Sequence, residues 1–175
     1  MNENLSSKIK KIKLIITDVD GVLTDGGIIY DNNFNEYKKY NVKDGQIISH
    51  LKKLGFIVGV ITGRESEVVK KRMEELKFNF AFHGVKDKLK IYEKIKNKYS
   101  LTDEEIAYIG DDIIDLSILS RCGLSVTPND AREYIKNEVD FVTKSKGGEG
   151  VFRDVADLIL KEQNLLENLI KEMKG

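Results

Sequence analysis

The sequence predicts an α/β protein, a Rossmann-like three-layer sandwich in which helices cover both faces of a parallel β-sheet. Short apolar runs rich in β-branched residues alternate along the chain with longer amphipathic segments, and this alternation is typical of right-handed βαβ units. No apolar run approaches the roughly 20 residues that span a bilayer. The length of 175 residues is close to the usual size of one domain, so we expect residues 1–175 to form a single domain.

Strands and helices are expected in alternation along the chain. We predict buried strands at 12–16, 56–61, 78–82, 106–109, 124–126 and 141–142. We predict helices at 46–54, 66–77, 88–99, 113–120 and 132–137, and a long final helix over about 151–173. Residues 26–42 interrupt this order, because two β-prone stretches there flank the turn-forming Asp31, Asn32 and Asn33. This segment is expected to be a β-hairpin inserted after the first strand.

The composition excludes several classes of function. The chain is 41% hydrophobic and 33% charged, which rules out intrinsic disorder. Its 29 basic and 29 acidic residues cancel, so no broad field attracts nucleic acid or an anionic membrane. The single cysteine, Cys122, forms no internal disulfide, and the first residues lack the apolar stretch of a secretory signal. We expect a cytoplasmic protein that binds a small ligand, and neither nucleic acid nor a membrane, through a local cluster of side chains.

Polar residues follow the predicted strands where ligands bind in an open parallel sheet, at the carboxyl ends. The first strand runs into Asp18 and Asp20, the second into Thr62, Gly63 and Arg64, and the fourth into Asp111 and Asp112, with Asp115 following. Carboxylates gathered at one edge repel one another, and Mg²⁺ is the cation that best offsets this while also binding a phosphate oxygen. Each acidic pair taken alone could instead be a turn or a helix cap. Acids at several strand ends together favour a metal site.

Lys88 gives an independent indication. It falls in the first turn of a predicted helix, where the helix dipole disfavours a cation unless an anion lies nearby. Lys88 could simply be solvated, and Thr62 could be a helix cap. Taken together, an ammonium and a hydroxyl that face a carboxylate cluster are suited to holding a phosphoryl group.

This set predicts phosphoryl transfer to an aspartate. Asp18 would attack phosphorus and form an aspartyl-phosphate. Asp20 would protonate the leaving alcohol and then activate the hydrolytic water. Thr62 and Lys88 would neutralise the phosphoryl oxygens, while Asp111 would hold the metal and Asp112 and Asp115 would support it.

The motifs resemble those of the haloacid dehalogenase-like phosphatase superfamily: DVDG at 18–21, Thr62, Lys88, and GDD with Asp115 at 110–115, in the same order. DVDGVLTDGG at 18–27, NVKDG at 41–45, VITGR at 60–64, IGDD at 109–112 and GGEGVFRD at 147–154 further resemble the small capless 3-deoxy-D-manno-octulosonate (KDO) 8-phosphate phosphatases. This resemblance implies Mg²⁺-dependent hydrolysis of a sugar-acid phosphate, KDO 8-phosphate, in lipopolysaccharide biosynthesis. It also implies a homotetramer in which the hairpins form a central barrel.

The same resemblance implies the roles of individual residues. Asp18, Asp111 and the backbone carbonyl of Asp20 would bind Mg²⁺. The residues that would contact substrate are Asp20, Asn41, Val42, Lys43, Asp44, Gly45, Gly63, Arg64, Arg72 and Lys88. Lys43 stands where many members carry Arg, and Ser49 is neutral where some are basic, so a sialic-acid-type 9-phosphate stays open as the alternative substrate.

The spacing leaves no room for a cap domain between Asp20 and Thr62, or between Thr62 and Lys88. Water would then be excluded by a neighbouring subunit. The hairpin carries more apolar surface than an isolated two-stranded flap buries, although these side chains could instead pack on their own domain. They are Ile28, Ile29, Tyr30, Phe34, Tyr37 and Tyr40. The segment 147–150 could enter an adjacent site or be a plain loop.

Two other classes of protein are alternatives to an enzyme. A phospho-accepting receiver domain uses a similar set of acids, hydroxyl and lysine, but here the expected nucleophile and the second aspartate share one loop and Lys88 precedes Asp111. A binding subunit that had lost catalysis would be expected to lack one of the reactive residues. The intact set favours a phosphatase.

Overall fold

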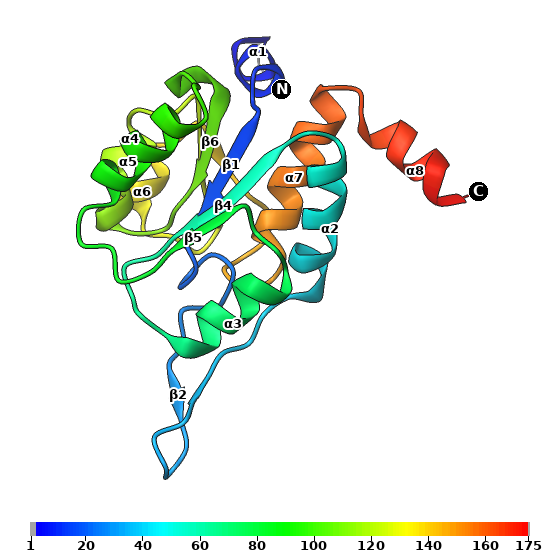
Figure 1. The fold of residues 1–175 in the computed structure, drawn as a ribbon. Coiled ribbons are helices and arrows are strands. Elements are labelled where there is room, and N and C mark those ends of the chain that lie inside the picture. Colours follow the sequence, from blue (N-terminus) through cyan, green and yellow to red (C-terminus); the bar gives the residue numbers. More distant parts are fainter. Residues whose placement is uncertain (1–2, 175) are drawn as a thin grey trace.

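The computed structural model describes residues 3–174, and it confirms the predicted α/β class (Figure 1). In this part of the chain, six parallel strands form one sheet in the order β5-β4-β1-β6-β7-β8. The strands are β1 (Leu14–Thr17), β4 (Ile57–Ile61), β5 (Phe80–Phe82), β6 (Ile106–Ile109), β7 (Leu124–Thr127) and β8 (Phe141–Val142). The two central strands β1 and β6 are fully buried, as expected for a sheet covered on both faces.

Helices cover both faces of the sheet, and each face has its own core. The helices are α1 (Glu3–Lys10), α2 (Val42–Lys53), α3 (Glu67–Glu75), α4 (Lys88–Lys98), α5 (Leu116–Leu119), α6 (Glu133–Lys136), α7 (Val151–Glu162) and α8 (Leu166–Lys174), with 3₁₀ turns η1 (Asp103–Glu105) and η2 (Ile113–Asp115). Side chains of α1, α2, α3 and α7 pack on one face, and those of α4, α5 and α6 on the other. No helix among residues 3–174 is long and apolar enough to cross a membrane.

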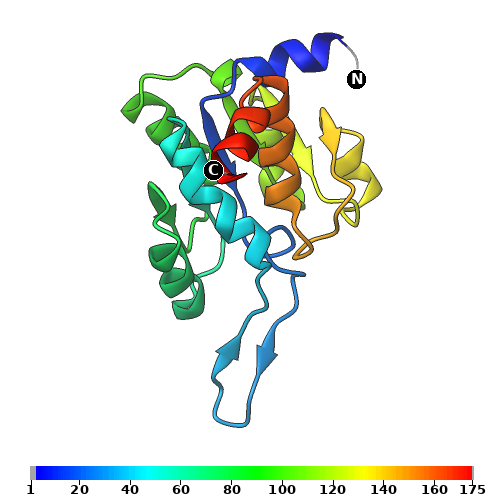
Figure 2. The same ribbon diagram turned by 90° about the vertical axis from the view of Figure 1, so that its right-hand side faces the viewer.

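The inserted segment forms the expected hairpin and projects away from the sheet (Figure 2). Strand β2 (Ile29–Tyr30) pairs antiparallel with β3 (Glu36–Tyr37). The Asp31 carboxylate accepts hydrogen bonds from the backbone N–H groups of Asn33 and Asn35, at 2.8 and 2.9 Å, and so closes the turn. The side-chain amide of Asn35, which donates to Asp31 Oδ2 at 2.8 Å, and these two N–H groups lower the pKa of Asp31 to about 2. No cap domain is present among the described residues.

Several element boundaries differ from the expected ones. The helix expected at 46–54 begins at Val42 instead, because the Asn41 side chain accepts the N–H of Lys43 and caps it. The final helix expected over 151–173 is interrupted, forming α7 and α8. Asn164 has a left-handed φ of 59° there, and the N–H of Leu165 donates to the Leu160 carbonyl at 2.8 Å, which is the pattern of a helix C-terminus. Helix α1 was not expected.

Candidate active site

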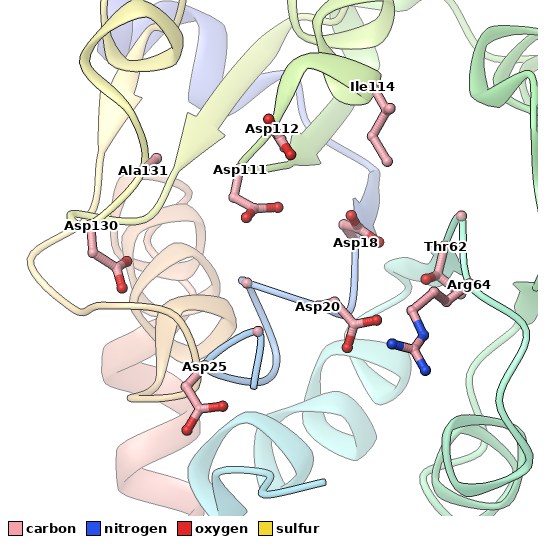
Figure 3. Close-up of a pocket in the computed structure, with 13 residues that line it drawn as sticks. Asp18, Asp20, Asp25, Thr62, Arg64, Asp111, Asp112, Ile114, Asp130 and Ala131 are labelled. Atoms are coloured by element: carbon pink, nitrogen blue, oxygen red, sulfur yellow. The ribbon is translucent and has the colours of Figure 1, made fainter. Parts of the chain in front are cut away.

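The strand register brings the expected residues to one edge of the sheet. Thr17, the last residue of β1, lies level with Val60 of β4 and Ile109 of β6. The residues that follow these strands, Asp18, Thr62 and Asp111, therefore emerge together and line a cavity of about 420 Å³ (Figure 3). The lining includes Asp18, Asp20, Gly21, Asp25, Gly26, Thr62, Gly63, Arg64, Asp111, Asp112, Ile114, Asp130 and Ala131.

Asp18 lies at the base of the cavity and is only 4% exposed. Its Oδ1 accepts the N–H of Val19 at 2.7 Å, and its Oδ2 lies 2.8 Å from Lys88 Nζ. Burial and the charge of Asp115 raise the pKa of Asp18 to about 6, although Lys88 opposes the shift. The carboxylate is thus held in one orientation by donors on both oxygens.

Lys88 begins helix α4, and its side chain is 1% exposed. Its ammonium bridges Asp18 Oδ2 at 2.8 Å and Asp115 Oδ1 at 2.7 Å. Burial alone lowers the pKa of Lys88, but the two carboxylates outweigh it and raise this pKa above its ordinary value. The alternative of a solvated lysine is therefore wrong.

Asp115 supports the site from behind and is not among the lining residues. Besides the ammonium of Lys88, its carboxylate accepts the Tyr108 hydroxyl at 2.6 Å and the N–H of Asp111 at 3.2 Å. A Cβ on Gly110 would lie 2.5 Å from the Asp115 carboxyl carbon. The close approach of η2 to the strand end therefore requires glycine at this position.

The environment of Asp111 fits a bound cation. Carboxylate oxygens of Asp18, Asp111 and Asp115 lie within 4.8 Å of one another, and Asp111 points its carboxyl group toward Asp18 in Figure 3. Burial, followed by the charges of Asp18, Asp115 and Asp112, raises the pKa of Asp111 to about 8. No donor among residues 3–174 forms a hydrogen bond to this carboxylate. Oxygen-rich, negatively charged sites of this kind suit Mg²⁺.

Gly21 allows this arrangement. Its φ is +85°, and a Cβ there would lie 2.0 Å from Asp111 Oδ2. A side chain at this position would be strained and would also push the Asp111 carboxylate away from Asp18. The glycine of the DVDG motif thus shapes the acidic cluster directly.

Thr62 and Arg64 enter the cavity from the end of β4. Thr62 is 2% exposed and its hydroxyl forms no hydrogen bond within residues 3–174, so it is available to a ligand. Ser66, rather than Thr62, caps α3, so the alternative of a helix cap is wrong for Thr62. Arg64 donates to Glu36 Oε1 at 2.8 Å and to the Tyr30 hydroxyl at 3.2 Å, both on the hairpin.

Asp20 contacts the hairpin as well. Its Oδ1 accepts the ammonium of Lys38 and, at 3.4 Å, the hydroxyl of Thr24. Lys38 and Glu36 were not expected to lie at the site. Their spacing was the available signal, because residues two apart in an extended segment point to the same side.

The expected substrate contacts at 41–45 and at Arg72 do not line the cavity of this chain. Asp44 is 4% exposed and accepts the N–H of Arg153 at 2.8 Å, so it binds the start of α7. Arg72 packs over the Tyr40 ring, 5.6 Å from its centroid, and pairs with Glu75 at 2.8 Å. Of the remaining four, Val42 and Lys43 are exposed and Asn41 and Gly45 are half-buried.

The chain is similar to known proteins over most of its length. Residues 82–154 match the haloacid dehalogenase-like hydrolase family. The 3-deoxy-D-manno-octulosonate 8-phosphate phosphatase KdsC of Haemophilus influenzae is 40% identical over 159 residues, which are 91% of this chain and 88% of that protein. KdsC of Escherichia coli K12 is 37% identical over 175 residues, 100% of this chain and 91% of that protein.

The fold is also similar to that of a solved structure. The phosphatase of the same name from Moraxella catarrhalis, in complex with magnesium, phosphate and KDO, superposes with a TM-score of 0.95 at 36% identity and covers 99% of both chains. The chain therefore belongs to the KdsC family of 3-deoxy-D-manno-octulosonate 8-phosphate phosphatases.

Proposed function

We propose that this protein is a Mg²⁺-dependent phosphatase that hydrolyses KDO 8-phosphate through an aspartyl-phosphate. The observation that carries the proposal is the buried Lys88, which bridges Asp18 and Asp115 beside an Asp111 carboxylate with no hydrogen-bond donor among residues 3–174. A buried ammonium orients the nucleophile, while the free carboxylate is left for a cation. Family membership and the KDO-bound relative support this substrate over a sialic-acid-type 9-phosphate.

The first half-reaction transfers the phosphoryl group to the protein. An Asp18 carboxylate oxygen attacks phosphorus, the bond from phosphorus to the sugar oxygen breaks, and Asp20 gives its proton to that oxygen. Lys88 and the free hydroxyl of Thr62 donate hydrogen bonds to the phosphoryl oxygens as charge develops. Asp18, Asp111 and the backbone carbonyl of Asp20 would hold Mg²⁺, which would supply positive charge to offset that of the phosphate.

The second half-reaction returns the protein to its starting state. Asp20, now a carboxylate, takes a proton from water, and the resulting hydroxide attacks phosphorus. The bond from phosphorus to Asp18 breaks and inorganic phosphate leaves. Arg64 and Gly63 line the cavity and are proposed to contact the sugar acid. Asn41–Gly45 and Arg72 are proposed to reach substrate only in an assembled protein, since they lie outside this cavity.

The setting we propose is a cytoplasmic homotetramer in lipopolysaccharide biosynthesis. A reducing compartment is supported by Cys122, the chain's single cysteine, which is buried and unpaired. Assembly is supported by the hairpin, where Phe34 is 85% exposed and Ile29 57% exposed. Apolar side chains presented this way favour contact with another copy. The pathway follows from the proposed substrate.

The test is release of inorganic phosphate from KDO 8-phosphate and from N-acetylneuraminate 9-phosphate, measured side by side with Mg²⁺ and with a chelator. We expect Mg²⁺-dependent release from KDO 8-phosphate with a clear preference over the 9-phosphate. Release only from the 9-phosphate would move the substrate to sialic acids and keep the mechanism. Release from neither would contradict the proposed function.

A further inference from the structure

The side chain of Lys38 is buried, although Lys38 belongs to a hairpin whose tip is exposed. Lys38 directly follows β3, and its side chain is 0% exposed, whereas the residue Phe34 at the tip is 85% exposed. The neighbouring Lys39 is exposed. Burying an ammonium is unfavourable unless carboxylates compensate it, so the contacts of Lys38 account for its position.

Those contacts lead directly to the site. The Lys38 ammonium donates to Asp20 Oδ1 and lies 3.8 Å from Glu36 Oε1. Glu36 in turn accepts Arg64 at 2.8 Å and also the hydroxyl of Ser66. Glu36 on β3 and Lys38 directly after it therefore hold two side chains of the cavity, Arg64 and Asp20, and Glu36 also offsets the charge of Lys38.

Asp20 has few other partners. Thr24 donates to Oδ1 at 3.4 Å, and Oδ2 is buried without a hydrogen-bond partner within residues 3–174. The Asp20 side chain nevertheless remains 23% exposed in the cavity. Without Lys38, this carboxylate would keep only the long contact with Thr24 and would be free to rotate. A general acid must lie within hydrogen-bond reach of the leaving oxygen, so its orientation decides its efficiency.

We propose that Lys38 is a positioning residue, which orients the Asp20 carboxylate toward the leaving group and so ties proton transfer to the hairpin. This inference rests on the proposed function, in which Asp20 is the general acid. Lys38 touches no reacting atom and acts through Asp20. Its loss should slow both steps in which Asp20 moves a proton, the departure of an alkoxide and the activation of water. It should spare the departure of a leaving group that needs no proton.

The experiment compares two leaving groups. The alkoxide released from KDO 8-phosphate must be protonated as it leaves, whereas p-nitrophenolate is a weak base and leaves without a proton. The first half-reaction is measured on its own, as sugar released in a single turnover and as the burst of p-nitrophenol before steady state, because Asp20 also activates water in the second half-reaction of both substrates. We expect Lys38→Met to lower the rate of sugar release from KDO 8-phosphate roughly 10-fold to 100-fold, part of the roughly 100-fold or more that general acid catalysis supplies. The burst rate for p-nitrophenyl phosphate should fall by less than about 3-fold. Asp20→Asn should give the same split, and a larger one.

Two further variants separate positioning from folding. Lys39→Met replaces the exposed lysine that is next in the chain, and it should leave the rates for both substrates unchanged. Lys38→Arg keeps a long cationic side chain and should restore most of the lost KDO 8-phosphate turnover. Thermal unfolding of each variant shows whether it folds.

Either of two results would overturn the inference. Equal losses in the first half-reaction of both substrates, in Lys38→Met and in Lys38→Arg, would show a purely structural role. Unchanged rates of the first half-reaction for both substrates would show no role. If the unmodified protein hydrolyses another primary alkyl phosphate but not KDO 8-phosphate, the proposed substrate is wrong. The unmodified protein and Lys38→Met are then compared with that alkyl phosphate in place of KDO 8-phosphate. A wrong substrate and a wrong role for Lys38 therefore give different results.

Discussion

Asp18 shows how one residue depends on its surroundings for reactivity. The backbone N–H of Val19 and the ammonium of Lys88 bind its two oxygens, so the side chain cannot rotate freely. A carboxylate is a weak nucleophile, and burial beside a cation holds it in one orientation and away from bulk water. The same contacts make Asp18 the most informative residue to change.

We predict that Asp18→Asn lowers turnover of KDO 8-phosphate by roughly 1,000-fold or more, because the amide keeps the shape but is no nucleophile. Phosphate release measures the loss, and calorimetry with Mg²⁺ should show that much of the metal binding is kept. Asp87→Asn is the matched control, because Asn caps α4 as well as Asp does. Turnover close to that of the unmodified protein in Asp18→Asn would refute the aspartyl-phosphate.

Asp44 gives a prediction about pH. Burial raises its pKa to about 6, against 3.8 when unfolded, while the N–H of Arg153 opposes the shift. Between these values the folded protein binds more protons than the unfolded one, so the contribution of Asp44 to stability is complete below pH 3.8 and is lost as pH rises through about 6.

Asp44→Asn removes this titration and keeps an oxygen for Arg153. We expect the free energy of unfolding of the variant, relative to the unmodified protein, to rise by roughly 1–3 kcal/mol between acid and neutral pH. Urea unfolding of both proteins at pH 4.5 and 7.5 measures the difference, in which the other carboxylates cancel. A difference that does not change with pH would contradict the raised pKa.

The positions of some of these residues could be predicted from the sequence, and those of others could not, for physical reasons. Asp18, Thr62 and Asp111 follow strands directly, and parallel strands bring their carboxyl ends to one edge, so local pattern was sufficient to bring them together. Asp44 belongs to a motif expected to contact substrate, but it lies where α7 begins. The contact of Asp44 with Arg153 and that of Lys38 with Asp20 both depend on how segments far apart in the sequence pack together. Hydrophobic periodicity carries no information on such packing.

The ends of the predicted helices were harder to place than the helices themselves, and the short helix α1 was not expected. The apolar stripe continues through the α7–α8 junction, so the pattern predicted one helix, whereas the left-handed Asn164 separates two. Helix α2 begins earlier than its apolar residues indicated, because Asn41 caps it. Capping acts on the backbone and leaves no trace in hydrophobic periodicity.

Asn41 therefore has a structural role that can be measured. We predict that Asn41→Ala destabilises the protein by about 1 kcal/mol, the usual effect of losing a helix cap, and that Asn41→Asp keeps the stability. Urea unfolding at neutral pH tests both. The KM for KDO 8-phosphate then separates the capping role from the proposed substrate contact: an aspartate that keeps stability but raises KM would indicate that Asn41 also touches substrate.

The open cavity and the exposed hairpin both indicate that another copy of the chain completes the protein. The described residues contain no cap domain over the cavity, yet phosphoryl transfer is favoured where bulk water is excluded. The hairpin is anchored to Asp20 and Arg64 at its base and exposes apolar residues beyond it. Assembly of hairpins from several copies would bury these side chains and bring further groups near each site.

The last prediction concerns this assembly. Sedimentation at low micromolar concentration should give about four times 19.9 kDa for the unmodified protein, and Ile29→Lys should shift it toward the mass of one chain. Ile29 is 57% exposed and pairs with Tyr37 across the hairpin, so a lysine there would place a charge on the apolar surface that the proposed assembly buries. Tyr134→Lys, at a position on α6 that is 50% exposed, should leave the mass unchanged. A monomeric unmodified protein would contradict both the tetramer and a site closed by a neighbouring subunit.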